Sequence, residues 1–107
     1  MTTLSVTVRD TPAGQIIVLD GQADITNFRL LAEGLFGHMP LGRKKLIVDA
    51  AKLAYMDSMA LRSLAQAARV LKQRGGHLTL LNPQLAVLKL LELVGADTYM
   101  VIQQQPG

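Results

Sequence analysis

The sequence predicts an α/β fold, in which helices pack on a mostly parallel mixed sheet with an antiparallel hairpin at its N-terminal edge. Three observations lead to this prediction. Short apolar runs with the character of strands alternate with longer segments of helical period. Only a turn sequence separates the first two runs, which is how antiparallel strands are joined. Finally, 107 residues are enough for one domain and too few for two. We therefore expect residues 1–107 to form a single domain of order β-β-α-β-α-β-α-β.

The hairpin is expected from the first twenty residues. Apolar and polar residues alternate over residues 4–8, which is the period of a half-buried strand. Turn residues occupy positions 11–14, and the continuous apolar run Ile-Ile-Val-Leu at 16–19 predicts a second strand. Gly21 is expected to end that strand.

A first helix is expected after Gly21. Either Asp24 or Thr26 can supply its N-cap, because both side chains carry an oxygen that accepts from an unpaired backbone N–H. Pro40 and Gly42 break the helical pattern. The apolar residues assigned to this helix are Leu30, Leu31, Leu35 and Phe36.

Lys45 opens the next strand, which comprises residues 46–48. Its β-branched Ile-Val pair and its lack of alternation predict a central strand that is covered on both faces. A further strand is expected from His77 to Leu81, between the last two helices.

The clearest helix follows Asp57 and Ser58. One stripe of its positions is apolar and the opposite stripe is polar, which is typical of a helix lying on a core. Gly75 and Gly76 come where a left-handed cap is expected. The apolar stripe contains Leu61, Leu64, Ala65, Ala68 and Leu71, and the polar stripe contains Arg62, Gln66, Arg69 and Gln73.

The third helix has the sequence signals of a defined start and end. Asn82 is expected at its N-cap and Pro83 at its first position, and Gly95 closes it. Residues 85–94 are apolar nearly all round, so the helix is either buried on several sides or exposes a binding patch. Burial under the C-terminal strand and tail is the favoured interpretation, and a homodimer is the alternative. Residues 99–102 are expected to form the last strand, and the tail from about residue 103 is expected to be disordered.

Composition excludes several classes of protein. The chain has no cysteine, which excludes disulfides, thiolate metal sites and cysteine catalysis. Its start lacks a signal-peptide pattern, and no apolar run approaches the roughly 18 residues of a membrane span. We therefore expect a cytoplasmic protein without membrane insertion. The net charge is +3, but the basic residues are dispersed apart from Arg43, Lys44 and Lys45, so we expect no direct contact with nucleic acid.

The sequence offers little support for catalysis, a metal site or a cofactor. The segment GHMPLGRK, which starts at Gly37, has the two glycines of a phosphate loop but lacks Lys-Ser/Thr after the second. It also lies before a strand instead of after one. His38 and His77 lie in different elements, and neither has a ligand three or four residues away. No Gly-x-Ser-x-Gly motif surrounds Ser58. We therefore expect a protein that is not an enzyme, with no metal and no cofactor.

The Asp57-Ser58 pair stands at the junction between a strand and a helix. Either side chain can cap the helix, a contribution of typically about 1 kcal/mol. A serine at an exposed helix start is also a suitable phosphorylation site, because the positive end of the helix dipole tolerates an added phosphate. The two interpretations are compatible.

The segment from Val48 to Ile102 resembles the bacterial anti-sigma factor antagonists, which are small STAS-domain proteins. The resemblance rests on an Asp-Ser-x-x-Leu turn after an apolar strand, then a long helix, Gly-Gly, a strand, and a helix that ends near a glycine. Upstream, LDGQADITN resembles the Gly-x-x-Asp element of the family at Gly21 and Asp24. The implied fold is STAS-like.

The resemblance implies that Ser58 is phosphorylated by a cognate anti-sigma factor, which is itself a serine kinase, and that a serine phosphatase resets it. The unphosphorylated form would bind the anti-sigma factor and release the sigma factor. The implied phosphorylation site is Ser58, and the implied partner-binding residues are Asp24, Met56, Asp57, Ser58, Met59 and Arg62.

Two positions differ from the family pattern. Met59 replaces a second hydroxyl and Ala60 replaces a glycine, which leaves one phosphoacceptor in the turn. An alternative therefore stays open, namely a STAS subunit that is not phosphorylated and that serves a stress-signalling scaffold or regulates a lipid transporter from the cytoplasm. A nucleotide-binding or hydrolytic domain is a third alternative, which no loop sequence supports.

Overall fold

The computed structural model describes residues 3–12, 14–39 and 45–105. The predicted order of elements is confirmed, with one short 3-10 helix added before the last strand. The elements are β1 (Leu4–Thr11), β2 (Gly14–Ala23), α1 (Phe28–Gly37), β3 (Lys45–Met56), α2 (Ser58–Gln73), β4 (His77–Leu81), α3 (Leu85–Leu93), η1 (Ala96–Thr98) and β5 (Val101–Gln103).

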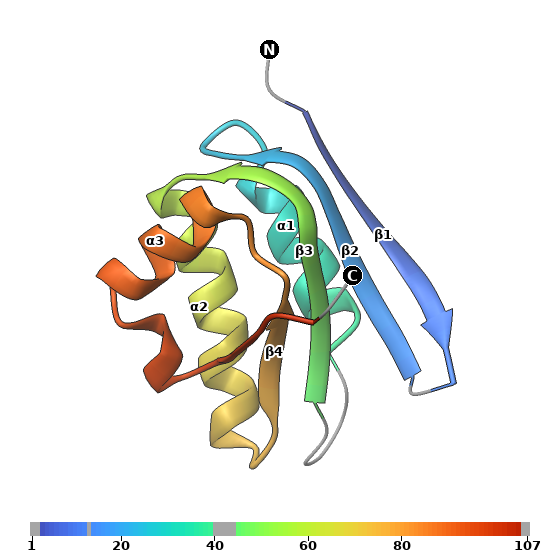
Figure 1. Ribbon diagram of the computed structural model, residues 1–107. Helices are drawn as coiled ribbons and strands as arrows, with labels where there is room; N and C mark the ends of the chain where they lie inside the picture. The colour runs from blue at the N-terminus through green and yellow to red at the C-terminus, as the bar shows by residue number, and fades with distance from the viewer. Residues whose placement is uncertain (1–2, 13, 40–44, 106–107) are drawn as a thin grey trace.

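The five strands form one mixed sheet in the order β1-β2-β3-β4-β5 (Figure 1). β1 and β2 are antiparallel, with Val8 opposite Ile17, and every later pair is parallel. The predicted N-terminal edge hairpin and mostly parallel sheet are therefore confirmed. Since consecutive parallel strands need a crossover, each of the three helices connects one strand to its neighbour.

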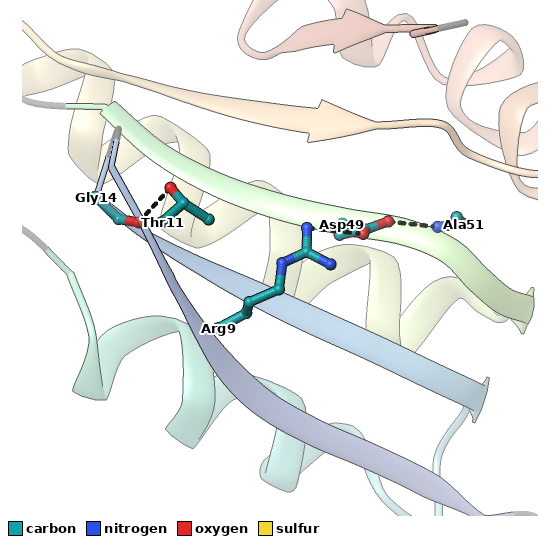
Figure 2. Close-up of polar contacts among 5 residues, drawn as sticks. All are labelled: Arg9, Thr11, Gly14, Asp49 and Ala51. Atoms are coloured by element: carbon teal, nitrogen blue, oxygen red, sulfur yellow. Dashed lines mark hydrogen bonds and ion pairs between the residues drawn. The ribbon is translucent and has the colours of Figure 1, made fainter. Parts of the chain in front are cut away.

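The expectation that β3 is covered on both faces is wrong. Leu46, Val48 and Ala50 are buried in the core, whereas Ile47 and Asp49 between them are only partly buried. On this second face Arg9 reaches from β1 across β2 to Asp49, with 3.5 Å between its Nη2 and Oδ2 (Figure 2). Helices α1 and α2 lie on the far side of the strands. An unbroken apolar run in β3 therefore did not require a second layer.

β2 and β3 are both longer than the sequence indicated. β2 continues past Gly21 to Ala23, and β3 continues through residues 49–56. Gly21 does not end the strand but lies at a register shift, with φ of 114°, where the backbone of Thr3 passes very close. Pairing with the irregular end of β2 holds residues 49–56 extended, although they lack the β-branched residues that favour strands.

The predicted caps of α1 are wrong. The helix begins at Phe28, and its N-cap is Asn27, whose side chain makes no capping hydrogen bond. Leu31 and Leu35 are fully buried as expected, but Leu30 and Phe36 are 43% and 42% exposed. A ten-residue helix on one face of a sheet therefore buries a narrower stripe than its composition suggested.

Helix α2 agrees with its predicted pattern. Its apolar stripe is buried, and the four polar residues opposite are exposed. It ends in a Schellman motif, in which Gly76 N–H donates to the carbonyl of Leu71 over 2.9 Å and Gly75 adopts φ of 80°. The helix thus supplies a straight, well-anchored segment behind the Asp57-Ser58 junction.

Helix α3 differs from its prediction in two respects. It begins at Leu85 after the N-cap Gln84, so Asn82 and Pro83 precede the helix and do not cap it. Asn82 has φ of 53°, and its Oδ1 accepts from the N–H of Gln105 at 2.6 Å. The helix is also not covered all round, because Leu85 and Leu93 are 66% and 83% exposed. The predicted close at Gly95 is confirmed by its left-handed φ of 68°.

The C-terminal segment is ordered further than expected. Gln103 belongs to β5, Gln104 donates to the carbonyl of Pro83, and Gln105 donates to Asn82. The last strand, expected at residues 99–102, spans Val101–Gln103. Several sequence features, namely Ala13 of the turn, Pro40, Gly42, Arg43 and Lys44 of the loop, and the final Pro106 and Gly107, lie outside the described residues.

Candidate functional site

Three segments that are far apart in the sequence meet at one end of the molecule. The loop after β2, the junction between β3 and α2, and helix α3 gather there, as Figure 1 shows. The backbone joins the first two, because the N–H of Asp57 donates to the carbonyl of Ala23 at 3.0 Å. The Gly21–Asp24 element and the Asp57-Ser58 turn therefore form one surface.

Asp57 holds this surface together with both of its carboxylate oxygens. Oδ1 accepts from the N–H of Ala60 at 3.0 Å and so caps helix α2. Oδ2 accepts from the N–H of Ile25 at 2.9 Å, across a sequence distance of 32 residues. One side chain thus satisfies an orphan donor of the helix and fixes the position of the loop after β2.

Asp24 is engaged within its own loop. Its Oδ1 accepts from the backbone N–H of Thr26 at 2.9 Å, and its own N–H donates to Oδ1 of Asn27 at 2.8 Å. The amide of Asn27 also donates to the carbonyl of Gln22. The loop is therefore a hydrogen-bonded turn that presents Ile25, which is 65% exposed.

Ser58 is the first residue of α2 and is exposed. Because Asp57 caps the helix, the Ser58 hydroxyl is not needed for capping, and it makes no hydrogen bond with any described residue. The carboxylate of Asp57 therefore has a structural role, and the hydroxyl of Ser58 is accessible to a ligand or a modifying enzyme. The sequence alone left open which of the two performed the capping.

Two grooves meet at Ser58. One, of about 450 Å³, is lined by Tyr55, Met56, Asp57, Ser58 and the α3 residues Ala86 and Leu90. The other, of about 330 Å³, follows α2 between Leu61, Arg62 and Arg69 towards Val94 and Tyr99. Ser58 therefore lines both the first groove, which is mostly apolar, and the second groove, which has cationic side chains.

The predicted partner-binding residues fall into two groups. Asp24, Asp57 and Ser58 lie together on this surface, and Arg62 is exposed one turn further along α2. Met56 is only 4% exposed, so its side chain belongs to the core and contributes to the floor of a groove at most. Met59 is partly buried.

Sequence reasoning missed the apolar residues around Ser58. Tyr55 is 48% exposed and Ile25 is 65% exposed, although isoleucine is usually buried and tyrosine is often partly buried. Ala86 and Leu90 approach from α3. Tyr55 precedes the buried Met56 in an extended segment, so strand alternation could have identified it had β3 been extended to residue 56.

Neither a metal site nor a membrane-spanning helix is found within residues 3–12, 14–39 and 45–105. No three His, Asp or Glu side chains are grouped so that they could hold a metal ion. No helix there is both long and apolar enough to cross a bilayer. The features of this end of the molecule are therefore an exposed hydroxyl, apolar side chains and a few charges.

Comparison with protein families identifies the fold. The model described as "Mlab, STAS domain" matches residues 6–103, which is nearly the whole chain. The chain belongs to the STAS-domain family. The resemblance inferred from the Asp-Ser-x-x-Leu turn and the Gly-Gly that follows α2 is thereby confirmed at the level of the family.

Solved structures of anti-sigma factor antagonists show the same fold at low sequence identity. An anti-sigma factor antagonist from Mycobacterium paratuberculosis superposes with a TM-score of 0.81 at 17% identity, over 94% of this chain and 85% of that one. The antagonist SpoIIAA in its unphosphorylated form gives 0.67 at 21% identity, over 99% and 89% of the two chains. The phosphorylated form of SpoIIAA from Bacillus gives 0.66 at 19% identity, over 99% and 92%. No sequence among curated proteins matches this chain.

Proposed function

We propose that this STAS domain is an anti-sigma factor antagonist, a protein-binding switch without enzymatic activity that is turned off by phosphorylation of Ser58. The observation that carries the proposal is the free Ser58 hydroxyl, which is exposed at the start of α2 and released from capping by Asp57. The partner is an anti-sigma factor with serine kinase activity, and a serine phosphatase restores the binding form. The similarity in fold to antagonists of known structure, one of them solved in a phosphorylated form, supports this proposal.

The surroundings of Ser58 suit a docking surface. Ile25, Tyr55 and Ala86 are exposed apolar residues within the same end of the fold. Exposed apolar side chains near a few polar groups are typical of the centre of a protein interface. Arg62, on the adjacent groove, adds a cation at the rim. We infer that the unmodified surface binds its partner through these residues.

A phosphate at Ser58 would disrupt such an interface electrostatically. It adds about −1.5 to −2 charges beside the carboxylate of Asp57. In water the helix dipole and solvent stabilise that charge, whereas beneath a docked protein it loses its hydration. Since 1.4 kcal/mol corresponds to tenfold in affinity, a penalty of about 3 kcal/mol lowers affinity more than a hundredfold. No large conformational change is needed.

The replacement of the family glycine by Ala60 is compatible with this mechanism. Ala60 is completely buried and belongs to the core cluster, so its methyl group points away from the surface on which a kinase would act. Its N–H still reaches Asp57. Met59, in place of the second hydroxyl, leaves Ser58 as the single acceptor in the turn.

A second candidate function has its own support. The matching family model is described as Mlab and not as an anti-sigma factor antagonist, and Met59 departs from the antagonist pattern. In this candidate the same surface binds a partner constitutively, as a subunit of a signalling scaffold or of a lipid transporter's cytoplasmic part. Both candidates predict binding through α2, but only the first predicts phosphorylation of Ser58.

Phosphorylation separates the two candidates. The purified protein is incubated with ATP and each serine-kinase anti-sigma factor of its cell, and the intact mass is measured. We expect a gain of one phosphate in the wild type and none in Ser58→Ala. Ser5→Ala is the matched control, because Ser5 is exposed on β1, far in sequence from the turn, and this variant should still be labelled. Labelling of Ser58→Ala, or no labelling by any kinase, would contradict the proposal.

Binding is measured with the same anti-sigma factors. Ser58→Glu should lower affinity at least tenfold, whereas Ser58→Ala should bind as the wild type does. Under the second candidate Ser58→Glu places its charge on the same docking surface and also weakens binding, so these variants alone do not separate the candidates. Addition of ATP to the wild-type complex does separate them, because it should release the partner under the first candidate and leave the complex intact under the second.

A further inference from the structure

Arg62 is an exposed cation on α2, one turn after Ser58. It makes no ion pair with any residue that the structure describes. On a helix surface the neighbours of a residue lie three and four positions away, and for Arg62 these are Ser58, Met59, Ala65 and Gln66. None of them carries a negative charge, and α2 contains no acidic residue. No side chain of the helix therefore neutralises the guanidinium.

Ser58 is the one helical neighbour of Arg62 that gains a negative charge when it is phosphorylated. A phosphate adds about −1.5 to −2 charges and three acceptor oxygens. Ser58 and Arg62 both line the groove of about 330 Å³ along α2, so they share one face of the helix. Their spacing of four positions brings Cβ atoms to about 5–6 Å, and an anion that precedes a cation at this spacing is the favourable order. A phosphate at Ser58 thus completes an ion pair for which the helix already holds one half.

The direction of helical side chains supports the same pair. A side chain on a helix leans towards the N-terminus and covers the turn before its own Cα, so Arg62 leans over the first turn of α2, where Ser58 lies. Arg69, the other cation of the groove, is eleven residues and therefore about 17 Å along the axis from Ser58. Its Cζ lies 4.7 Å from the centre of the Tyr99 ring. The residues that α3 contributes to the two grooves at Ser58 are uncharged.

We propose that Arg62 binds the phosphoryl group of phosphorylated Ser58 in the free protein. The guanidinium donates N–H bonds to two phosphate oxygens, which is the forked geometry by which arginine recognises phosphate. The phosphate itself rests on the proposed function, and the inference adds the residue that holds it.

The pair changes the docking surface in a second way. In the unmodified protein Arg62 is available at the rim to an anionic group of the partner. Once the phosphate holds Arg62, a partner meets an added anion and also loses this cation. Phosphorylation therefore alters the surface at two positions one helical turn apart, and no movement of the backbone is required.

The charges around the phosphate fix the sign of the test. Arg62 favours the dianion and so lowers the second pKa of phosphoserine, whereas the adjacent carboxylate of Asp57 favours the monoanion and raises that pKa. Asp57 and the start of α2 are the same in every variant of the test. Differences in pKa between the variants therefore report the cation.

Phosphorus NMR on the free protein tests the pair. Phosphoserine is placed at position 58 of the full chain during translation, so neither a kinase nor an anti-sigma factor is needed, and the protein is titrated at low ionic strength. The second pKa of phosphoserine should be higher by at least about 0.3 in Arg62→Gln than in the wild type. Arg62→Lys should restore most of the difference, because it keeps the charge. In 1 M salt the difference should shrink.

Arg69→Gln is the matched control. It removes an exposed arginine from the same helix and groove, but one too far from Ser58 to reach the phosphate, so it should leave the phosphoserine pKa unchanged. Circular dichroism verifies that each variant is folded, which is expected because both arginines are exposed.

Equal phosphoserine pKa values in the wild type and Arg62→Gln would overturn the inference. So would an equal rise in Arg69→Gln, or an Arg62→Lys that behaves as Arg62→Gln does. A failure of every kinase to label Ser58 would instead contradict the proposed function, because the NMR titration uses no kinase.

Discussion

Replacement of Asp57 by alanine tests how the candidate site is held together. The change removes the N-cap of α2, which contributes about 0.5–2 kcal/mol in proteins. It also removes the acceptor of the Ile25 N–H, a hydrogen bond of about 0.5–1.5 kcal/mol. Because Ile25 is exposed, water can replace that acceptor, and we take the lower end for this bond. Together the losses lower the free energy of unfolding by about 2 kcal/mol.

This loss is large enough to measure in a domain of this size. With an unfolding entropy of about 2.1 cal/mol/K per residue, a loss of about 2 kcal/mol lowers the midpoint of thermal unfolding by about 9 °C. Urea unfolding followed by circular dichroism gives the free energy itself. Hydrogen exchange of the Ile25 amide should become faster, because its protecting bond to Oδ2 is gone.

Asp57→Asn divides the two contributions. Asparagine caps helices about as well as aspartate does, so the bond to Ala60 survives, while the amide nitrogen that replaces one oxygen cannot accept from Ile25. We expect a loss of about 0.5–1 kcal/mol and the same faster exchange at Ile25. Ser58→Ala is the control and should change stability by less than about 0.5 kcal/mol, because its exposed hydroxyl does no capping. The reasoning is refuted if Ser58→Ala destabilises as much as Asp57→Ala, or if Asp57→Asn leaves exchange at Ile25 unchanged.

Three further changes probe the fold. Gly21→Ala should lower the free energy of unfolding by more than about 2 kcal/mol, whereas Gly14→Ala should lower it by about 1–2 kcal/mol. Both glycines have φ near 115°, but only at Gly21 would a Cβ collide with backbone, namely that of Thr3. Equal losses in urea unfolding would contradict this close approach of Thr3. Leu64 is only 1% exposed, so Leu64→Ala leaves a cavity and should lower the free energy of unfolding by about 2–5 kcal/mol. The exposed Leu30 is the control, and Leu30→Ala should lower it by well under about 1 kcal/mol. Similar midpoints of urea unfolding for the two variants would argue against the core described for α2. Arg9→Ala should cost at most about 1 kcal/mol, and less in 1 M salt, because Arg9 is 55% exposed; a loss independent of salt would show that its ion pair is not the cause.

The fold was largely readable from local patterns. Helix α2 shows why, because its apolar stripe, its Asp57 cap and its Gly75-Gly76 end all give the same answer at the level of sequence. Where such signals conflict with distant contacts, the prediction failed. Asn82 and Pro83 are residue types that favour a helix start, yet the Asn82 side chain accepts from the backbone N–H of Gln105, and the helix begins at Leu85, two residues later than predicted.

The candidate site was predicted in part. Ser58 and Asp57 were found because both residue types cap helices and because the Asp-Ser-x-x-Leu turn resembles that of the anti-sigma factor antagonists. The sequence did not show that Asp57 also binds the loop after β2, because that contact is made to the N–H of Ile25, which is 32 residues away. The exposure of Tyr55 and Ile25 was missed for the same reason: whether an apolar side chain is covered depends on elements that pack from elsewhere in the chain.

The amino-acid sequence by itself determined which segments are helices and strands, their order, and the presence of a serine hydroxyl at the start of α2. These properties follow from interactions between residues a few positions apart, whose spacing is visible in the chain. The tertiary structure alone decided that Ile47 and Asp49 of β3 stay only partly buried, that Asp57 serves both α2 and the loop after β2, and that α3 leaves Leu85 and Leu93 in solvent. Each of these depends on which distant segments meet, and a burial pattern along one segment does not reveal the surface that faces it.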